Sequence, residues 1–127
     1  MTARTSGSIR VVGTGLLGTS IGLALRKIGV DVILSDASPA AQSLAIDYGA
    51  GRAALDSDKP AVIVVCVPPD VTADLVSREL RAFPNAIVTD VASVKTAILD
   101  ALTQAGADLS RYVGSHPMAG RERGGAA

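Results

Sequence analysis

A short glycine-rich turn between two apolar runs constrains the fold of this chain more than any other feature. The first apolar run is Ile9–Val12, and the turn follows it without a break. A helical pattern then extends over Leu16–Lys27, and a second apolar run, residues 31–35, leads into Asp36. The glycines of the turn have GxGxxG spacing and are Gly13, Gly15 and Gly18. This order of strand, turn, helix and strand predicts a βαβ unit with two parallel strands.

The three glycines suit a turn that binds a dinucleotide. Gly13 permits the tight turn, Gly15 lets the main chain approach a pyrophosphate, and Gly18 lets the helix pack closely on the sheet. The first turn of the helix offers unpaired N–H groups and the positive end of the helix dipole to the phosphates. We therefore expect the cofactor-binding residues of this segment to be Gly13, Thr14, Gly15, Leu16, Leu17 and Gly18.

Asp36 follows the last glycine by 18 positions, close to the spacing of about 20 that is usual for a ribose-binding acid. A carboxylate at this position hydrogen-bonds the adenosine ribose hydroxyls and repels a 2′-phosphate. Ala37 and Ser38 supply no arginine to hold such a phosphate. We therefore expect NAD rather than NADP as the cofactor. The alternative for Asp36 is a helix-capping or solvated carboxylate.

The length and composition indicate one domain and exclude several classes of partner. The chain has 127 residues, of which 48% are apolar and 2% aromatic, as is typical of an α/β domain. Its formal net charge is zero, so no overall basic field favours nucleic acid or an anionic membrane. No apolar run reaches the ~18 residues of a membrane span, and the N-terminus lacks the apolar stretch of a signal peptide. We expect a cytoplasmic enzyme or enzyme fragment.

Alternating strand and helix signals predict the fold class: α/β, a Rossmann-type parallel sheet with helices on both faces. We expect a disordered tail over residues 1–7 and one NAD-binding domain over residues 8–127. Strands are predicted at residues 9–12, 31–35, 61–67, 86–89 and 111–114, and an ambiguous segment at 51–58 suits a short edge strand and a turn. Helices are predicted at residues 16–27, 39–47, 70–82 and 95–104. Ser38 and Asp70 are the predicted N-caps of the second and third helices.

The run at residues 61–67 is apolar throughout, which is typical of a strand buried on both faces. It contains Cys66, the only cysteine, so an intrachain disulfide is impossible and we expect a reduced, buried thiol. Val67, Pro68 and Pro69 end the run. Proline fixes φ and removes a hydrogen-bond donor. These residues therefore form either a rigid wall beside a bound nucleotide or only a strand terminator.

Segments far apart in the sequence are expected to meet in one site. Ligands of open α/β sheets bind beyond the carboxyl ends of the strands, and those ends lie together at one edge of a parallel sheet. The segments at such positions are residues 13–15, Asp36, residues 68–69, residues 90–93 and residues 115–116.

Two of these segments carry candidate catalytic side chains, Ser93 and His116. Ser93 is either the N-cap of the helix that follows or a group that orients a substrate hydroxyl or a histidine. His116 is the only histidine, and it is either structural or a base, because an imidazole can accept a hydroxyl proton at neutral pH. No second histidine or cysteine stands at ligand spacing, so we expect no metal site.

Four segments together resemble the prephenate dehydrogenase family. They read G-T-G-L-L-G-T-S, V-V-C-V-P-P, T-D-V-A-S-V-K and G-S-H-P-M-A-G-R-E, and the likeness extends from Ile9 to about Gly125. The S-H-P-M-A-G segment is highly specific among NAD-dependent dehydrogenases, whereas the other segments are shared more widely. The resemblance implies oxidative decarboxylation of prephenate to 4-hydroxyphenylpyruvate in tyrosine biosynthesis, or of arogenate to tyrosine.

The resemblance also implies roles for the two candidate catalytic residues. In the family, the histidine of S-H-P-M-A-G draws the proton from the ring C4 hydroxyl while hydride leaves that carbon for NAD, and this role falls on His116. The serine of the D-x-x-S-V-K segment orients the histidine and the substrate, and this role falls on Ser93. Loss of a hydroxyl proton during hydride departure is the kind of step that an imidazole base assists.

The family pattern continues beyond this sequence. A helical second domain follows, which forms a homodimer and adds a cationic clamp for substrate carboxylates. This chain stops before it, and Gly124 replaces a serine or threonine that is common there. Arg121 and Arg123 are the basic residues near His116 in sequence, and they are either clamp residues or part of a solvated loop. The open alternatives are a stand-alone NAD-binding module without turnover and a dehydrogenase of the same fold for another hydroxy acid.

Overall fold

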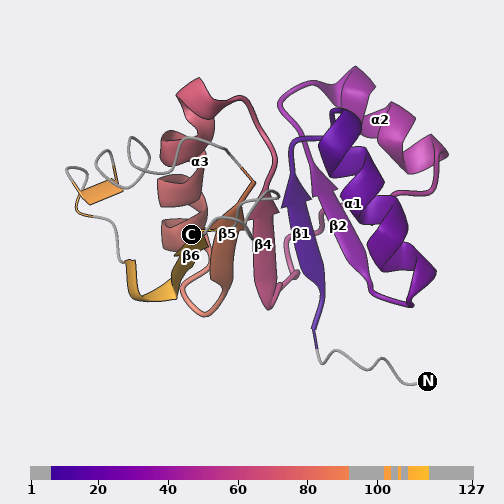
Figure 1. Cartoon of the computed structure of the whole chain (residues 1–127). Coiled ribbons are helices and arrows are strands. Elements are labelled where there is room, and N and C mark those ends of the chain that lie inside the picture. The colour runs from indigo at the N-terminus through magenta and orange to yellow at the C-terminus, as the bar shows by residue number, and fades with distance from the viewer. Residues whose placement is uncertain (1–6, 92–101, 104–105, 107–108, 115–127) are drawn as a thin grey trace, which may run out of the picture.

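The computed structural model of the chain describes residues 7–91, 102–103, 106 and 109–114. In this part, six strands form one parallel sheet in the order β3-β2-β1-β4-β5-β6 (Figure 1). The strands are β1 (Ile9–Val12), β2 (Val32–Ser35), β3 (Arg52–Ala53), β4 (Val62–Val65), β5 (Ile87–Asp90) and β6 (Tyr112–Gly114). The chain runs outward from β1 to β3, returns to β4 beside β1, and then runs outward in the other direction. The strand order therefore reverses between β1 and β4.

Helices pack on both faces of this sheet, as the sequence predicts for a Rossmann-type fold. The helices are α1 (Leu16–Lys27), α2 (Pro39–Asp47) and α3 (Pro69–Ala82). α1 packs on β1 and β2, α2 packs on β2 and β3, and α3 packs on β4 and β5. Val11 and Val12 are neighbours on β1 and point to opposite faces. Val11 belongs to the apolar cluster under α1 and α2, and Val12 belongs to the cluster under α3.

The first βαβ unit follows the predicted bounds closely. β1 and α1 begin and end where the sequence indicates, and β2 begins one residue later, at Val32. Ser38 is the N-cap of α2, because its hydroxyl accepts a hydrogen bond from Ala41 N at 3.2 Å. Local signals of turn, cap and apolar period agree here, and such agreement is what makes a segment predictable.

Two predictions around β4 and α3 are wrong in detail. β4 is shorter than predicted, and Val62 and Val64 are partly exposed, so this strand is not buried on both faces. Asp70 is not the N-cap of α3, because the helix already begins at Pro69, with Pro68 as its cap residue. Proline suits the first helical position, where its missing N–H would have no partner.

The last strand is tied to the third helix through Arg111, which ends the short 3₁₀ turn Leu109–Arg111 before β6. Its guanidinium donates to the carbonyl oxygens of Leu80 at 2.7 Å, Phe83 at 3.0 Å and Ala86 at 2.6 Å. These carbonyls lie in the last turn of α3 and in the turn after it. Leu102–Thr103 are helical, and the rest of the predicted helix at 95–104 lies outside the described residues, as do residues 1–6 of the predicted tail.

Candidate functional site

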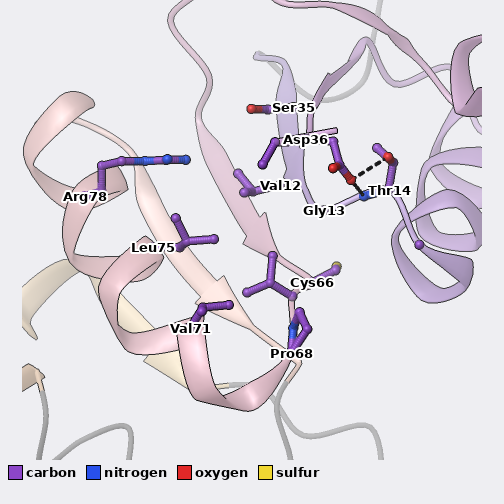
Figure 2. Close-up of a pocket in the computed structure, with 13 residues that line it drawn as sticks. Val12, Gly13, Thr14, Ser35, Asp36, Cys66, Pro68, Val71, Leu75 and Arg78 are labelled. Carbon is purple, nitrogen blue, oxygen red and sulfur yellow. Dashed lines mark hydrogen bonds between the residues drawn. The ribbon is translucent and has the colours of Figure 1, made fainter. Parts of the chain in front are cut away.

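A cavity of about 400 Å³ opens at the carboxyl ends of β1, β2 and β4 (Figure 2). This is the point where the strand order reverses, which is the usual ligand position in open α/β sheets. One side of the cavity is the turn after β1, and the opposite side is α3. The residues that line it are Val12, Gly13, Thr14, Gly15, Ser35, Asp36, Ala37, Cys66, Val67, Pro68, Val71, Leu75 and Arg78.

The turn between β1 and α1 has the geometry that the glycine spacing predicts. Gly13 has a φ of +98°, and a Cβ there would lie 2.3 Å from the Cys66 carbonyl oxygen. A Cβ on Gly18 would lie 1.9 Å from the Gly13 carbonyl oxygen. A Cβ on Gly15 would meet nothing within 4 Å, because this residue faces the open cavity. Gly13 and Gly18 are thus required for packing, whereas Gly15 leaves room for a ligand.

The N-terminus of α1 faces the same space and suits an anion. Gly15 is the N-cap and has no side chain to accept a hydrogen bond from the first turn. Unpaired N–H groups and the helix dipole together favour a phosphate at such a position. Leu16 and Leu17 have exposed side chains and do not line the cavity, so any contribution they make to binding comes from their main-chain N–H groups. Absence of a Cβ on Gly15 and free N–H groups fit the pyrophosphate of a dinucleotide.

Asp36 stands directly after β2 and is held by the turn beside it. Its Oδ2 accepts hydrogen bonds from Thr14 N at 2.6 Å and Thr14 Oγ1 at 2.7 Å, and its Oδ1 accepts one from Ser38 N at 2.8 Å. Burial raises the pKa of this carboxyl, but the hydrogen bonds from Ser38 and Thr14 together lower it below its ordinary value. Asp36 is therefore ionised at neutral pH.

The hydrogen-bonding capacity of Asp36 is not exhausted by these contacts. A carboxylate oxygen has two acceptor positions, and Oδ1 uses one of them for Ser38 N. Because Asp36 also lines the cavity, its remaining acceptor position is available to a hydroxyl of a bound ribose. The structure thus combines the two interpretations of this residue: the carboxylate braces the chain locally and also faces the ligand space.

The segment after β4 both ends the strand and forms part of the cavity wall. β4 ends at Val65, and Val67 and Pro68 line the cavity. Pro69 is the first residue of α3 and does not line it. The predicted wall is therefore made by two of the three residues, and the third starts the helix that continues the wall.

The α3 side of the cavity is a feature that the sequence interpretation missed. Val71, Leu75 and Arg78 lie four and three residues apart on α3 and all line the cavity. This spacing places them on one face of a helix. A signal was therefore present in the sequence, but it becomes meaningful only when the sheet order shows which face of α3 meets the ligand.

The floor of the site contains the thiol of Cys66, which is half-buried and not buried as the sequence predicts, because it lines the cavity. Burial, and secondarily the charge of Asp90, raises the pKa of Cys66 to about 11. Asp90 is fully buried at the end of β5 and accepts a hydrogen bond from the Tyr112 hydroxyl on β6. Burial and this hydrogen bond raise the pKa of Tyr112 above its ordinary value, so Tyr112 remains a donor.

The two predicted catalytic residues, Ser93 and His116, lie outside the described residues. The strands that lead to them are described: β5 ends at Asp90 and β6 ends at Gly114, within three residues of each. Among the described residues, no group of three or more metal-ligating side chains could hold an ion. None of the described helices combines the length and apolar character that a membrane span requires.

Known proteins resemble this chain along nearly its whole length. The model of the prephenate dehydrogenase nucleotide-binding domain matches residues 21–127. Probable prephenate dehydrogenase NovF from Streptomyces niveus is 42% identical over 115 residues, which are 91% of this chain and 32% of that protein. Prephenate dehydrogenase from Bacillus subtilis (strain 168) is 31% identical over 131 residues, which are 94% of this chain and 35% of that protein.

A solved structure shows the same relationship. Arogenate dehydrogenase from Synechocystis superposes with a TM-score of 0.73 at 33% identity, over 91% of this chain and 42% of that one. The chain spans about a third of the length of the curated relatives that it matches. With the glycine turn, the reversal of strand order and the family match in agreement, the chain belongs to the prephenate dehydrogenase family and forms a Rossmann-type domain that binds NAD.

Proposed function

We propose that this chain supplies the cofactor-binding domain of a cytoplasmic, NAD-dependent enzyme that oxidatively decarboxylates prephenate to 4-hydroxyphenylpyruvate in tyrosine biosynthesis. The observation that carries the proposal is the cavity at the strand-order reversal, with a Cβ-free turn on one side and the ionised Asp36 at its edge. The family match, which includes the S-H-P-M-A-G segment, supports the choice of substrate.

The cofactor preference follows from Asp36. Its carboxylate would accept hydrogen bonds from the ribose hydroxyls of NAD and would repel the 2′-phosphate of NADP. Because its pKa is lowered from 3.8, the ionised form persists across the neutral range. The contribution of the Asp36 carboxylate to NAD affinity should therefore be constant across the neutral range and be lost only when the pH falls to the lowered pKa of the folded chain.

We propose that His116 and Ser93 carry the chemistry. Bound NAD supplies the hydride acceptor for the reaction. The His116 imidazole takes the proton of the C4 hydroxyl as hydride leaves C4, and the ring then loses carbon dioxide and becomes aromatic. The Ser93 hydroxyl orients His116 and the substrate. This assignment rests on the sequence segments that contain the two residues.

Arogenate is the second candidate substrate, because the similar Synechocystis structure is an arogenate dehydrogenase. The two substrates differ in the side chain, where prephenate has a keto group and arogenate has an amino group. Assays of the full-length enzyme with each substrate separate the candidates. If kcat/KM is higher for arogenate than for prephenate, arogenate becomes the proposed substrate.

Titration of the isolated chain with NAD and NADP by calorimetry tests the cofactor site. Wild type should bind NAD more tightly than NADP, and Asp36→Ala should weaken NAD binding by about 1–3 kcal/mol, as expected for lost hydrogen bonds to a charged group. Asp31→Ala is the matched control. Asp31 precedes β2, at the end of the strand remote from the cavity, and forms an ion pair with Arg52. Equal affinities for NAD and NADP in wild type would contradict the assignment of Asp36.

His116 is tested in the full-length enzyme. His116→Asn should leave the Kd for NAD nearly unchanged and lower kcat by at least ~10², the lower range for general acid–base catalysis. Ser93→Ala should cost less, because water can replace one hydroxyl. Normal turnover of His116→Asn would remove His116 from the mechanism.

We further propose that catalysis requires a helical partner domain, which would provide the homodimer interface and the carboxylate clamp. Holding the substrate in a reactive geometry can contribute about 7–11 kcal/mol. The isolated chain should therefore bind NAD but reduce none in the presence of prephenate, as followed by nicotinamide absorbance. Turnover near ~10 per second would show that the 127 residues suffice. NAD binding without turnover even in the full-length protein would favour a binding module.

A further inference from the structure

The α3 side of the cavity presents an arginine to the end of the site that Asp36 marks. Arg78 lines the cavity together with Val71 and Leu75, and its side chain is 51% exposed. Figure 2 shows Arg78 extending from α3 across the cavity toward the strand end that carries Ser35 and Asp36. If NAD binds with its ribose at Asp36, as proposed above, the adenine base occupies this region between β2 and α3.

Hydrogen bonds to Glu79 hold one edge of the Arg78 guanidinium. Its Nε and Nη2 donate to Glu79 Oε2 at 3.2 Å and 2.9 Å. Glu79 is itself fixed, because its carboxylate is 1% exposed and its Oε1 accepts from Arg10 Nε at 2.7 Å. N–H hydrogen bonds of a guanidinium lie in its plane, so these contacts orient the plane and leave its flat faces uncovered by hydrogen bonding.

Arg10 anchors this arrangement from the sheet. Its Nη2 donates to Ser35 Oγ at 3.3 Å, and its guanidinium lies 5.0 Å from the centre of the Phe83 ring. The ion pair between Arg10 and Glu79 joins β1 to α3. The orientation of Arg78 is therefore set by contacts that reach across the domain.

The chemistry of this wall favours a flat aromatic ring over a phosphate. Val71 and Leu75 add apolar surface beside Arg78. Two donors of Arg78 are already used by Glu79, and the carboxylate of Asp36 at the same end disfavours a further anion. A guanidinium face stacks well on an aromatic π-system, and the contact gains from the positive charge.

We propose that Arg78 is a specificity-determining residue that recognises the adenine base of the cofactor by stacking its guanidinium face on the ring, and this proposal rests on the proposed NAD function. Arg78 acts on the end of the cofactor remote from the nicotinamide. Its effect is therefore on cofactor affinity and not on the chemical step.

The test compares wild type with Arg78→Ala and Arg78→Lys, using NAD, NADP, AMP and nicotinamide mononucleotide as ligands. Both variants should weaken NAD and AMP by a common factor of about 5- to 30-fold. Binding of nicotinamide mononucleotide, which has no adenine, should stay within about twofold of wild type. Arg81→Ala is the matched control, because Arg81 also lies on α3 but pairs with Ser77 and does not line the cavity. Thermal melts of every variant verify that the domain remains folded.

The alternatives give different outcomes. Wild-type affinity in Arg78→Lys with a loss in Arg78→Ala would mean that charge alone matters, which overturns stacking. A loss confined to NADP would mean that Arg78 contacts a 2′-phosphate, which also overturns it. The proposed function and the adenine site can fail separately. If the wild-type chain binds AMP but not NAD, the proposed function is refuted. In that case, weaker AMP binding by both Arg78 variants would still support the adenine site.

Discussion

On one side of the nucleotide cavity the turn after β1 presents main-chain N–H groups, and on the other side α3 presents side chains. The glycine-turn wall works because Gly15 lacks a Cβ and because Gly13 and Gly18 let the chain pass close to its neighbours. The α3 wall presents Arg78, which is held in place by Glu79, and Glu79 is paired with Arg10.

The difference between the two walls lies in how far each depends on distant parts of the chain. The glycine-turn wall is specified within one short segment and its contact with Asp36. The α3 wall depends on a buried ion pair between residues that are 69 positions apart. Adding a single methyl group to a glycine should disrupt the glycine-turn wall, whereas removing one partner of the buried ion pair should disrupt the α3 wall.

The largest effect is expected when the carboxylate behind the α3 wall is removed. Glu79→Ala leaves Arg10, which is only 13% exposed, without its anion, and breaking a buried pair typically costs about 3–5 kcal/mol. Urea unfolding measures the loss. The control is Asp31→Ala, which removes the partner of Arg52 from a pair that is 55% and 36% exposed and should cost about 0–1 kcal/mol. Equal losses in the two variants would show that burial of the Arg10–Glu79 pair is unimportant.

A somewhat smaller effect is expected when the glycine-turn wall is changed. Gly13→Ala combines a strained positive φ with a Cβ at 2.3 Å from a carbonyl oxygen, and we expect a loss of about 2–4 kcal/mol. Gly15→Ala is the matched control, since its Cβ would meet only open space. It should cost less than about 1 kcal/mol and instead weaken NAD binding, as calorimetry would show. Unchanged NAD affinity in Gly15→Ala would show that the pyrophosphate does not bind at the glycine turn.

The smallest effect concerns Cys66, which lies between the two walls. Because its pKa is raised to about 11 from 9.0, the thiolate fraction continues to grow well above pH 9. Labelling by iodoacetamide should therefore accelerate up to about pH 11, and NAD should slow it, since Cys66 lines the cavity. The urea-unfolded chain is the control and should reach its plateau near the ordinary thiol pKa. A plateau near pH 9 in the folded chain would show that partial burial does not raise the pKa of Cys66.

The sequence predicts the glycine-turn wall well because its signals are local. The bounds of β1 and α1, the cap at Ser38 and the position of Asp36 all follow from residues that are neighbours in sequence. The parallel sheet with helices on both faces also follows, because strand and helix signals alternate. Family membership adds NAD as the cofactor.

The α3 wall was not predicted because its parts meet only in three dimensions. Helical spacing places Val71, Leu75 and Arg78 on one face, but the sequence does not state which face meets the cavity. The N-cap of α3 lies two residues before the predicted one, because Asp70 is a good cap by residue type while Pro69 suits the first helical position better. The roles of Ser93 and His116 stay predictions.

Arg111 joins the last described strand to the helix that lines the cavity. Its hydrogen bonds to Leu80, Phe83 and Ala86 tie the start of β6 to the last turn of α3 and the turn after it, and α3 also carries Arg78. One helix is thus the common reference for the α3 wall of the cavity and for the strand that leads toward His116. A displacement of α3 would therefore move the α3 wall and the start of β6 together.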